Sequence, residues 1–397
     1  MFQLLFSIYL LLFFRYTEGD VLAYQLSRIM DESIEPRPWL TAIVLTLAFV
    51  AVAQLAEKLI RCNGYEGKSA YAVAAWAAAM LTSWHFVSPR YLILLTFAGF
   101  VVTILTIAIG RWKDGNHEKT TKIPVQSTEK IAHGTKYITR HTESANTPSF
   151  WRKCYPRLLQ LLLLFLFLGI GSGTTDLQHY ELRTAQALQT GHYKRAYHTG
   201  DKSYVTSPRL FAMRCYLMAR SQKKGLGEKA FEQMVPPGGS KCLLLPTDHE
   251  QQLLFPADSL YHLLGSMPHK GESALKYFQR CAWISSFNGK PNRAAIDYYL
   301  TALLLERNLP QFANEVVRYY PRETAQNSLP TYFAQAMVLY KRICECPIVD
   351  YHDSSIEANY TDYQDMGDTI ANTTIRRNTL RYSYGETYWW WYQYGSH

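Results

Sequence analysis

Long apolar runs occupy the N-terminal part of the chain, up to Gly173, and are separated by short polar segments. The runs are residues 2–14, 40–56, 69–87, 91–110 and 158–173. A helix needs about 20 residues to cross the hydrocarbon core of a membrane, and the third and fourth runs reach that length. The second run reaches this length if the next helical turn is included. The fifth run is shorter but too apolar for a protein surface in water. We therefore predict four membrane-spanning helices, and a fifth if the first run stays attached to the chain.

The first run is shorter than a full span. No basic residue precedes it, and no small-x-small cleavage site follows it. This pattern favours a short anchor helix over a cleaved signal peptide. Both alternatives place residues 15–39 on the same side of the membrane, so the topology of the rest does not depend on the choice.

The loops between the runs carry unequal numbers of basic residues. Residues 57–68 and 111–157 contain three and ten Lys or Arg, whereas residues 15–39 and 88–90 contain three and one. Because basic loops stay in the cytoplasm, the bias predicts a cytoplasmic N-terminus and places residues 174–397 outside, in the periplasm if the membrane is a bacterial inner membrane. Contact between the basic loop and anionic lipid headgroups accounts for the net charge of +9 without a nucleic-acid partner.

The predicted spans contain almost no ionisable side chains. Only His85 lies within a well-supported span, beside Trp84 and one turn from the end of its helix. Transporters and proton relays need titratable groups inside the membrane, so this pattern argues against ion-coupled transport. Ala70, Ala74 and Ala78 instead form a small-residue face, which predicts close packing within the bundle or between two copies of the chain in a homo-oligomer.

From about residue 174 the pattern changes to helices of moderate length with polar faces. Gly191 and Ala196 are repeated at Gly225 and Ala230 with the same interval between glycine and alanine, and Tyr193 lies within the first pair. A glycine relaxes the turn between two helices, and an alanine lets the second helix lie close to the first. The period resembles that of the tetratricopeptide repeat, whose stacked helical hairpins form a concave surface suited to peptides. We expect these five residues to form the repeat turns.

The resemblance to the repeat is incomplete. Gly227 stands where the motif has an aromatic residue, and Thr184 stands where it has glycine. Further helices are predicted from apolar spacing, out of phase with the first two copies, at 274–285, 293–307, 311–319 and 331–343. An insertion at 236–258, rich in proline and glycine, explains the lost phase. We expect helical hairpins without strict repeats.

The C-terminal segment is first acidic and then aromatic. Six acids occur between residues 350 and 368 with no Lys or Arg, and they lack the register of a calcium loop, so a solvated acidic helix or loop is predicted. More than half of the positions from 382 to 394 are aromatic, among them Tyr388, Trp389 and Trp390. Such rings favour a terminal segment that docks on the last hairpin or enters the headgroup region. The alternative is an aromatic surface that binds a peptide or a glycan.

Motifs for catalysis and metal binding do not occur at their usual spacings. No pair among the seven cysteines has the two-residue separation of a redox or zinc motif, and no His-x-x-x-His pair encloses a glutamate. No Gly-x-Ser-x-Gly turn occurs either. We therefore expect no cofactor and no metal, and we nominate no catalytic residue. The five cysteines after residue 174 would allow one or two disulfides outside the cytoplasm but do not require them.

Over most of its length the chain resembles a family of bacterial inner-membrane proteins of unknown function. The resemblance rests on residues 329–340, LPTYFAQAMVLY, and on Tyr388, Trp389 and Trp390. Such proteins combine several N-terminal spans with tetratricopeptide-like helices and an aromatic tail. The resemblance implies an architecture and brings no activity.

The expected architecture is all-α, with an N-terminal transmembrane helix bundle followed by an α-helical hairpin domain. We expect membrane helices at 1–110 and 158–173, and a basic cytoplasmic loop at 111–157. A tetratricopeptide-like domain is predicted at 174–346, and a separate C-terminal segment at 347–397.

Two functional hypotheses follow from this architecture. The first is a membrane-anchored adaptor or assembly protein without chemistry of its own, which binds a protein or peptide through the hairpin surface. Its candidate contacts are Tyr180, Arg183, Tyr388, Trp389 and Trp390. The second is a membrane enzyme or accessory subunit in envelope glycan or lipid handling, or in transport.

Overall fold

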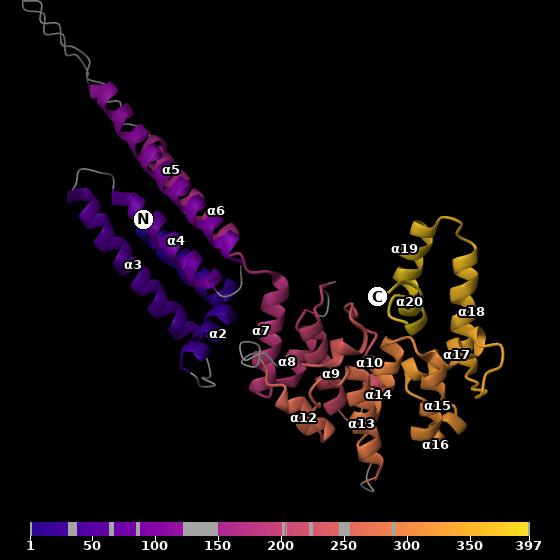
Figure 1. Ribbon diagram of the computed structural model, residues 1–397. Helices are drawn as coiled ribbons and strands as arrows, with labels where there is room; N and C mark the ends of the chain where they lie inside the picture. Colours follow the sequence, from indigo (N-terminus) through magenta and orange to yellow (C-terminus); the bar gives the residue numbers. More distant parts are fainter. Residues whose placement is uncertain are drawn as a thin grey trace, which may run out of the picture. The chain divides into compact units, whose positions relative to one another are not determined.

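A computed structural model describes residues 2–30, 38–62, 67–84, 88–121, 150–200, 203, 205–221, 225–245, 255–287 and 291–395. Every regular element in these ranges is a helix, which confirms the all-α class (Figure 1). The chain divides into two compact units, Met1–Thr175 and Asp176–His397, called here the N-terminal and the C-terminal unit. His85 and the centre of the basic loop, residues 122–149, lie outside the described residues.

The N-terminal unit is a bundle of helices around α4. Its elements are α1 (Phe2–Leu12), the π-helical turn η1 (Phe13–Thr17), α2 (Gly19–Met30), α3 (Pro38–Cys62), the 3-10 turn η2 (Gly67–Ser69), α4 (Ala70–Ser83), α5 (Pro89–Thr121) and α6 (Phe150–Gly171). Helix α4 contacts α3, α5 and α6. Ala70, Ala74 and Ala78 are buried in these contacts, because small side chains let the backbones approach. The alanine face predicted from the sequence thus packs inside this chain.

Three helices of this unit are long and apolar enough to span a membrane. They are Trp39–Ile60, Pro89–Ile109 and Cys154–Gly171. Their outward side chains are apolar, as with Leu47 at 65% and Phe97 at 66% exposure. Such a surface is suited to lipid and not to water. The segment Phe2–Thr17 and helix α4 are shorter, and α4 covers less than the predicted run at 69–87.

The C-terminal unit is a stack of helices of about three turns joined by short loops. Its elements are α7 (Asp176–Gln189), α8 (Tyr193–His198), α9 (Pro208–Arg220), α10 (Leu226–Lys229), the 3-10 turn η3 (Gly239–Leu243), α12 (Asp258–Leu264), α13 (Ala274–Phe287), α14 (Arg293–Leu305), α15 (Leu309–Tyr319), α16 (Pro321–Ala325), α17 (Thr331–Ile343), α18 (Ser354–Asp368), α19 (Thr373–Tyr384) and α20 (Tyr388–Tyr394). The helices predicted from apolar spacing are confirmed as α13, α14, α15 and α17, with only small differences at their ends.

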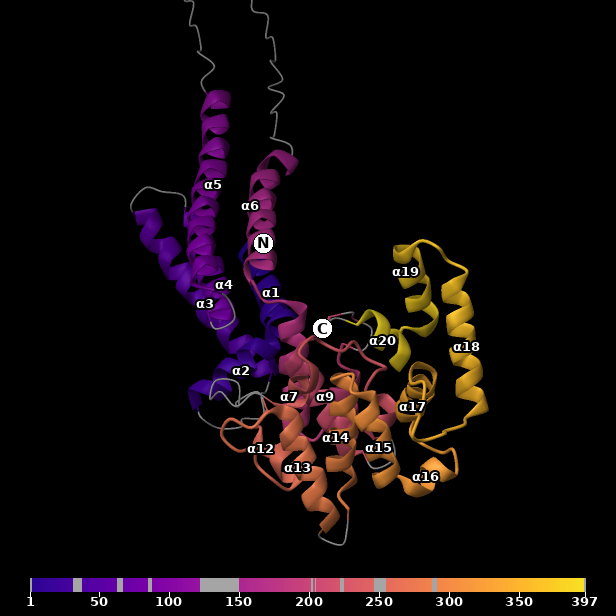
Figure 2. The same ribbon diagram turned by 45° about the vertical axis from the view of Figure 1, so that its right-hand side comes forward.

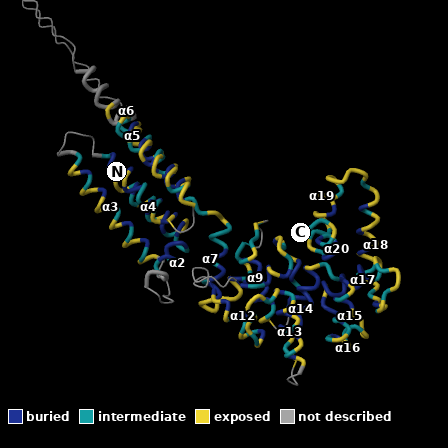
Figure 3. The backbone as a smooth tube through the Cα atoms, viewed as in Figure 1, coloured by how far each residue is buried: buried dark blue, intermediate teal, exposed yellow. Residues whose placement is uncertain are grey.

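Helix α14 forms the centre of the C-terminal unit. All of its residues from Ala294 to Leu305 are buried, and it contacts α9, α10, α12, α13 and α15. Figure 3 shows that burial is concentrated around α9 and α14. A helix that is apolar around its whole circumference is stable only when neighbours cover every face. The other helices of this unit are therefore arranged around α14.

Helices α18 and α19 are less buried than this core, and the short helix α20 follows them. Figures 1 and 2 show α18 and α19 running side by side, with α20 next to α19. Leu380 is the single buried residue of α19, whereas α18 buries Tyr360, Tyr363 and Gly367. The acidic segment predicted as a solvated helix or loop is thus a helix, with its aromatic side turned inward.

Candidate binding pocket between α17 and α20

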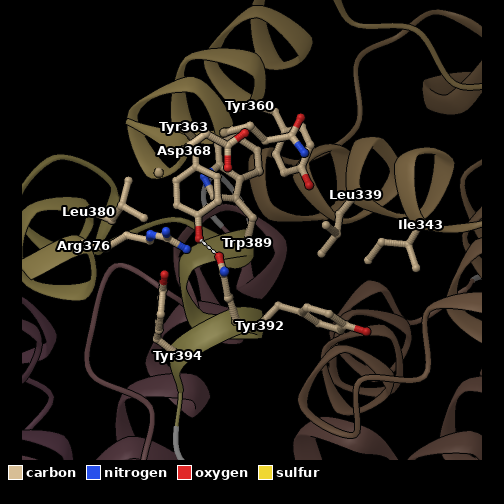
Figure 4. Close-up of a pocket in the computed structure, with 13 residues that line it drawn as sticks. Leu339, Ile343, Tyr360, Tyr363, Asp368, Arg376, Leu380, Trp389, Tyr392 and Tyr394 are labelled. Carbon is tan, nitrogen blue, oxygen red and sulfur yellow. Dashed lines mark hydrogen bonds between the residues drawn. The ribbon is translucent and has the colours of Figure 1, made fainter. Parts of the chain in front are cut away.

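A pocket of about 310 Å³ opens between α17, α18, α19 and α20 (Figure 4). Helix α17 contributes two aliphatic side chains, and the other three helices contribute aromatic, amide and charged groups. The lining residues are Leu339, Ile343, Tyr360, Tyr363, Gln364, Gly367, Asp368, Arg376, Leu380, Trp389, Tyr392, Gln393 and Tyr394. Ligand pockets in proteins begin at about this volume, and the mixture of ring faces and polar groups is typical of them.

Helix α20 is fixed to the core by hydrogen bonds at its first turn. The Tyr388 backbone N–H donates to Oε1 of Gln335 at 2.8 Å, and the Tyr388 hydroxyl donates to the Leu304 carbonyl at 3.1 Å. The hydroxyl of Thr387 caps the helix by accepting from the Trp390 N–H. These bonds join α20 to α14 and α17, so the aromatic residues of α20 have a defined position at the pocket. The start of the aromatic tail therefore packs on helices of the core.

Caps at two helix starts define the hairpin of α18 and α19. The Asp353 carboxylate accepts two backbone N–H groups of α18 at 3.1 Å each, and the Asn372 side chain accepts two of α19 at 3.0 and 3.1 Å. Such caps satisfy amides that have no partner inside the helix. Leu380 packs at Gly367, where an added Cβ would lie 3.6 Å from Leu380 Cδ1. Helix α19 therefore borders the pocket although few of its side chains pack against neighbouring helices.

Aromatic rings form the inner wall of the pocket. The Trp389 ring meets Tyr360 edge-on at 5.3 Å between centroids, and it lies 6.1 Å from Tyr363. Tyr363 in turn meets Tyr384 edge-on at 5.4 Å, and its hydroxyl donates to Oε1 of Gln393. Edge-to-face contacts of this kind hold rings in one orientation. The wall therefore has a fixed shape.

Two charged side chains of opposite sign line the pocket. Arg376 Nε donates to the Ile370 carbonyl at 2.8 Å, which leaves its terminal nitrogens without a partner among the described residues. Figure 4 shows this side chain extending from α19 toward the hydroxyls of Tyr363 and Tyr394. Asp368 is exposed and makes no ion pair within the described part of the chain. Both charges are available to a ligand.

The tyrosine hydroxyls of the inner wall are neutral donors. Burial raises the pKa of Tyr360 and of Tyr363 above the ordinary value of 10.0. Desolvation disfavours the charged phenolate, so both groups keep their protons at neutral pH. The fixed charges of the pocket lining are therefore those of Arg376 and Asp368.

The five predicted contact residues lie in two separate places. Tyr180 and Arg183 are half-buried on α7, and a Cβ at Gly200 would lie 3.0 Å from the Tyr180 ring. Tyr388 is fully buried, Trp389 is 2% exposed but lines the pocket, and Trp390 is half-buried and does not line it. The structure therefore does not bring these residues together. Tyr388 belongs to the interior, and only Trp389 faces the pocket.

The first predicted repeat turn has the geometry of a helical hairpin. Gly191 lies between α7 and α8 with φ +73°, a conformation that glycine adopts readily. Ala196 is fully buried on α8, and Arg220 lies 4.7 Å from the Tyr193 ring centroid. Helix α8 has only 6 residues, whereas α7 has 14. The second helix of this hairpin is therefore much shorter than the first.

The second predicted turn differs from the first. Gly225 has φ −69°, and it is needed for space, because a Cβ there would lie 2.5 Å from Oδ2 of Asp297. Ala230 is buried at the end of α10, a helix of a single turn. Asp297 accepts a hydrogen bond from the Tyr320 hydroxyl, and burial raises the pKa of its carboxyl to about 6. The same spacing of small residues thus serves two different local needs.

Most pocket residues carry no motif that a sequence search would select. Asp368 was part of the acidic run, and Arg376 is the first base after it. The useful signal was the three- and four-residue spacing of Tyr360, Tyr363 and Gly367, which marks one face of a helix. That face shows which side of the acidic helix is buried, but not which helices lie opposite it.

Metal and redox sites are not found in the described ranges. No group of three His, Cys, Asp or Glu could hold a metal ion there. Cys215, Cys242, Cys281, Cys344 and Cys346 are free thiols. Burial raises the pKa of Cys215 and of Cys281, which makes these thiols less reactive.

Residues 286–395 match the model of a family of unknown function (DUF6057). This segment contains α14 to α20 and every residue that lines the pocket. No curated protein and no solved structure matches the chain. The match is consistent with an uncharacterised family, and the description of that family names no activity.

Proposed function

We propose that this chain is a membrane-anchored binding protein that holds a partner protein at its C-terminal unit. It acts as an adaptor or assembly factor and performs no chemistry of its own. The proposal is supported by the division of the chain into an apolar bundle and a separate helical unit. A unit of packed helices attached to membrane helices is suited to capturing a partner near the lipid surface.

The proposed location is a bacterial inner membrane, with a cytoplasmic N-terminus and the C-terminal unit in the periplasm. The loops at 57–68 and 111–157 together hold 13 Lys or Arg, whereas those at 15–39 and 88–90 together hold only four. Basic loops resist transfer across the membrane, so the difference supports this orientation. The periplasm would then supply the partner.

The proposed scaffold is a stack of helical hairpins of the tetratricopeptide kind. Support comes from α13, α14, α15 and α17, helices of 11 to 14 residues in which each packs against the next along the chain. Stacks of this kind present long surfaces to extended partners. The short helices α8 and α10 make the first hairpins irregular, so the regular part of the stack lies within residues 274–343.

The outer face of α19 is the observation that carries the proposal. Ile375 is 57% exposed and Tyr382 is 95% exposed, and their seven-residue spacing places them on one side of the helix. Helix α19 also has no acid, and its Arg377 is exposed outside the pocket. An apolar stripe on a basic helix is complementary to an acidic amphipathic segment of a partner. The proposed partner segment is therefore acidic and carries apolar residues at helical spacing.

Site-specific crosslinking in intact cells tests this proposal. A photoreactive residue at Tyr382 is expected to crosslink one acidic membrane or periplasmic protein, and the same residue at Met267 is not. Met267 is a matched control because it is 60% exposed and lies far from α19 in the chain. Ile375→Asp should abolish the adduct, since it places an acid opposite an acidic partner. Equal crosslinking at both positions, or none at Tyr382, would contradict the proposal.

A second candidate is an accessory subunit in the handling of envelope glycans. The pocket favours it, because aromatic faces and unpaired polar groups meet there. This pocket is separate from the outer face of α19, so the two candidates are compatible.

A further inference from the structure

We propose that the pocket between α17 and α20 binds an acidic saccharide, that is, a sugar ring that carries a carboxylate. This inference rests on the second candidate function and deepens it. It is independent of the adaptor function, because it concerns the inner side of α19 and not the outer face with Ile375 and Tyr382. It rests on three properties of the pocket: ring faces, unpaired hydrogen-bonding groups and one arginine.

The ring faces suit the C–H side of a sugar. Tyr360, Tyr363, Trp389, Tyr392 and Tyr394 all line the pocket. The face of an aromatic ring carries partial negative charge, and it attracts the weakly positive C–H groups on one side of a pyranose. Figure 4 shows Tyr392 on the side of Leu339 and Ile343, and Tyr394 on the side of Arg376. Rings therefore occur at both ends of the pocket.

The polar groups suit the hydroxyl rim of the same ring. The side chains of Gln364, Asp368 and Tyr394 make no hydrogen bond with the described residues, and Nε2 of Gln393 is likewise without a partner there. A saccharide presents hydroxyls around its edge, each of which donates and accepts. Amide, carboxylate and phenol groups match such a rim. A lipid chain or an apolar peptide side chain would leave them unpaired, at a cost for each group that it covers.

The arginine selects a carboxylate on the sugar. Arg376 is held by the bond from its Nε to the Ile370 carbonyl, and its two terminal nitrogens remain available. A guanidinium fixed in this way can donate two parallel hydrogen bonds to one carboxylate. Asp368 lines the same pocket and suits the hydroxyls, whereas it would repel a second acidic group nearby. The pocket therefore matches a ring with one carboxylate.

The volume limits the ligand to a short saccharide. About 310 Å³ lies at the lower end of small-molecule pockets, which leaves room for one or two rings. Longer polymers would extend into solvent through the open side. The chemistry is thus that of a uronate unit within a glycan, or of a free acidic sugar of the same kind.

Calorimetric titration of the purified full-length chain in detergent tests this inference. The probes are galacturonate, a single ring with one carboxylate, and galactose, its neutral counterpart. Galacturonate is expected to bind at least tenfold more tightly than galactose. Absence of galacturonate binding at millimolar concentration, or equal binding of both probes, would overturn the inference.

Two neighbouring arginines give a matched pair of variants. Arg376→Gln should remove the preference for the acidic probe, whereas Arg377→Gln should leave it unchanged, because Arg377 is exposed and does not line the pocket. Tyr394→Ala should weaken both probes by a similar factor through loss of a ring face. Unchanged selectivity in Arg376→Gln would overturn the assignment of the carboxylate to this residue.

A folded-state control separates this test from that of the adaptor. Arg376→Gln should keep the crosslink at Tyr382, since the outer face of α19 is untouched. Loss of the preference for the acidic probe with retention of the crosslink supports the inference. Saccharide binding in the absence of any partner crosslink would contradict the adaptor proposal alone.

Discussion

The two units of this chain differ in what their surfaces carry. The N-terminal unit buries small residues such as Ala74 together with rings such as Phe14, and it exposes large apolar side chains such as Phe97. The C-terminal unit buries large rings such as Phe312 and Phe333 and exposes most of its charges. In water, the burial of apolar area drives helices to pack. In lipid, the acyl chains are as apolar as the side chains, so helices pack mainly through close contact between their backbones. The difference indicates that the two units fold in different solvents.

This comparison predicts that a phenylalanine-to-alanine substitution costs much more stability in the C-terminal unit than on the surface of the N-terminal unit. Phe333→Ala should lower the free energy of unfolding by about 3 to 5 kcal/mol, because the ring is fully buried and its loss leaves a cavity. Phe100→Ala, on the lipid side of α5 at 64% exposure, should change it by about 0.5 kcal/mol or less. Urea unfolding of the full chain in micelles, followed by tryptophan fluorescence, measures both. Equal losses would break the comparison.

An added charge should have the larger effect in the N-terminal unit. Phe97→Asp places a carboxylate near the middle of Pro89–Ile109 and should disfavour membrane insertion by about 3 kcal/mol. Met267→Asp, at similar exposure in the C-terminal unit, should change little. The inserted fraction after carbonate extraction reports the effect. Full insertion of Phe97→Asp would mean that this helix does not face lipid.

The buried carboxyl of Asp297 makes the C-terminal unit sensitive to pH. Its pKa is about 6 in the folded chain and 3.8 ordinarily, so the unfolded chain releases this proton at lower pH. The free energy of unfolding should therefore fall by about 2 to 3 kcal/mol as the pH rises from about 4 to about 6, and stay level above. Asp297→Asn should remove this fall. Urea midpoints at pH 4 and pH 7 measure it, and an equal fall in the variant would contradict the assignment.

Removing one hydrogen bond that holds α20 should have the smallest effect on stability. Tyr388→Phe removes the hydrogen bond from the buried hydroxyl to the Leu304 carbonyl and should lower the free energy of unfolding by about 1 kcal/mol. Tyr392→Phe is the control, because that hydroxyl has no partner among the described residues. Thermal unfolding by circular dichroism compares the two. A larger loss in Tyr392→Phe would mean that α20 is held in another way.

The fold class and most helices of the C-terminal core could be predicted, because apolar residues at three- and four-residue spacing depend only on local pattern. The bounds of α13, α14, α15 and α17 followed from that spacing. The repeat turns could not be predicted as well. Gly191 is required by a positive φ and Gly225 by the approach of Asp297, and the regular interval between the two glycines does not distinguish these reasons.

The pocket could not be predicted, because its walls come from four helices whose contacts are not local. The aromatic tail suggested a surface, yet Tyr388 is buried and only part of the tail lines the pocket. Arg376 and Asp368 carried no motif, and their importance depends on the hairpin that brings α19 beside α18. Sequence pattern indicates which faces are buried, and tertiary packing decides which faces meet.

The side of the membrane on which the C-terminal unit lies decides which partners can reach it. Alkaline phosphatase fused after His397 is active only outside the cytoplasm. Green fluorescent protein fused at the same position stays dark when it is exported unfolded. We expect an active phosphatase and a dark fluorescent fusion, because the basic loops keep the N-terminus in the cytoplasm. An inactive phosphatase with a bright fluorescent fusion would contradict this topology and place the pocket in the cytoplasm.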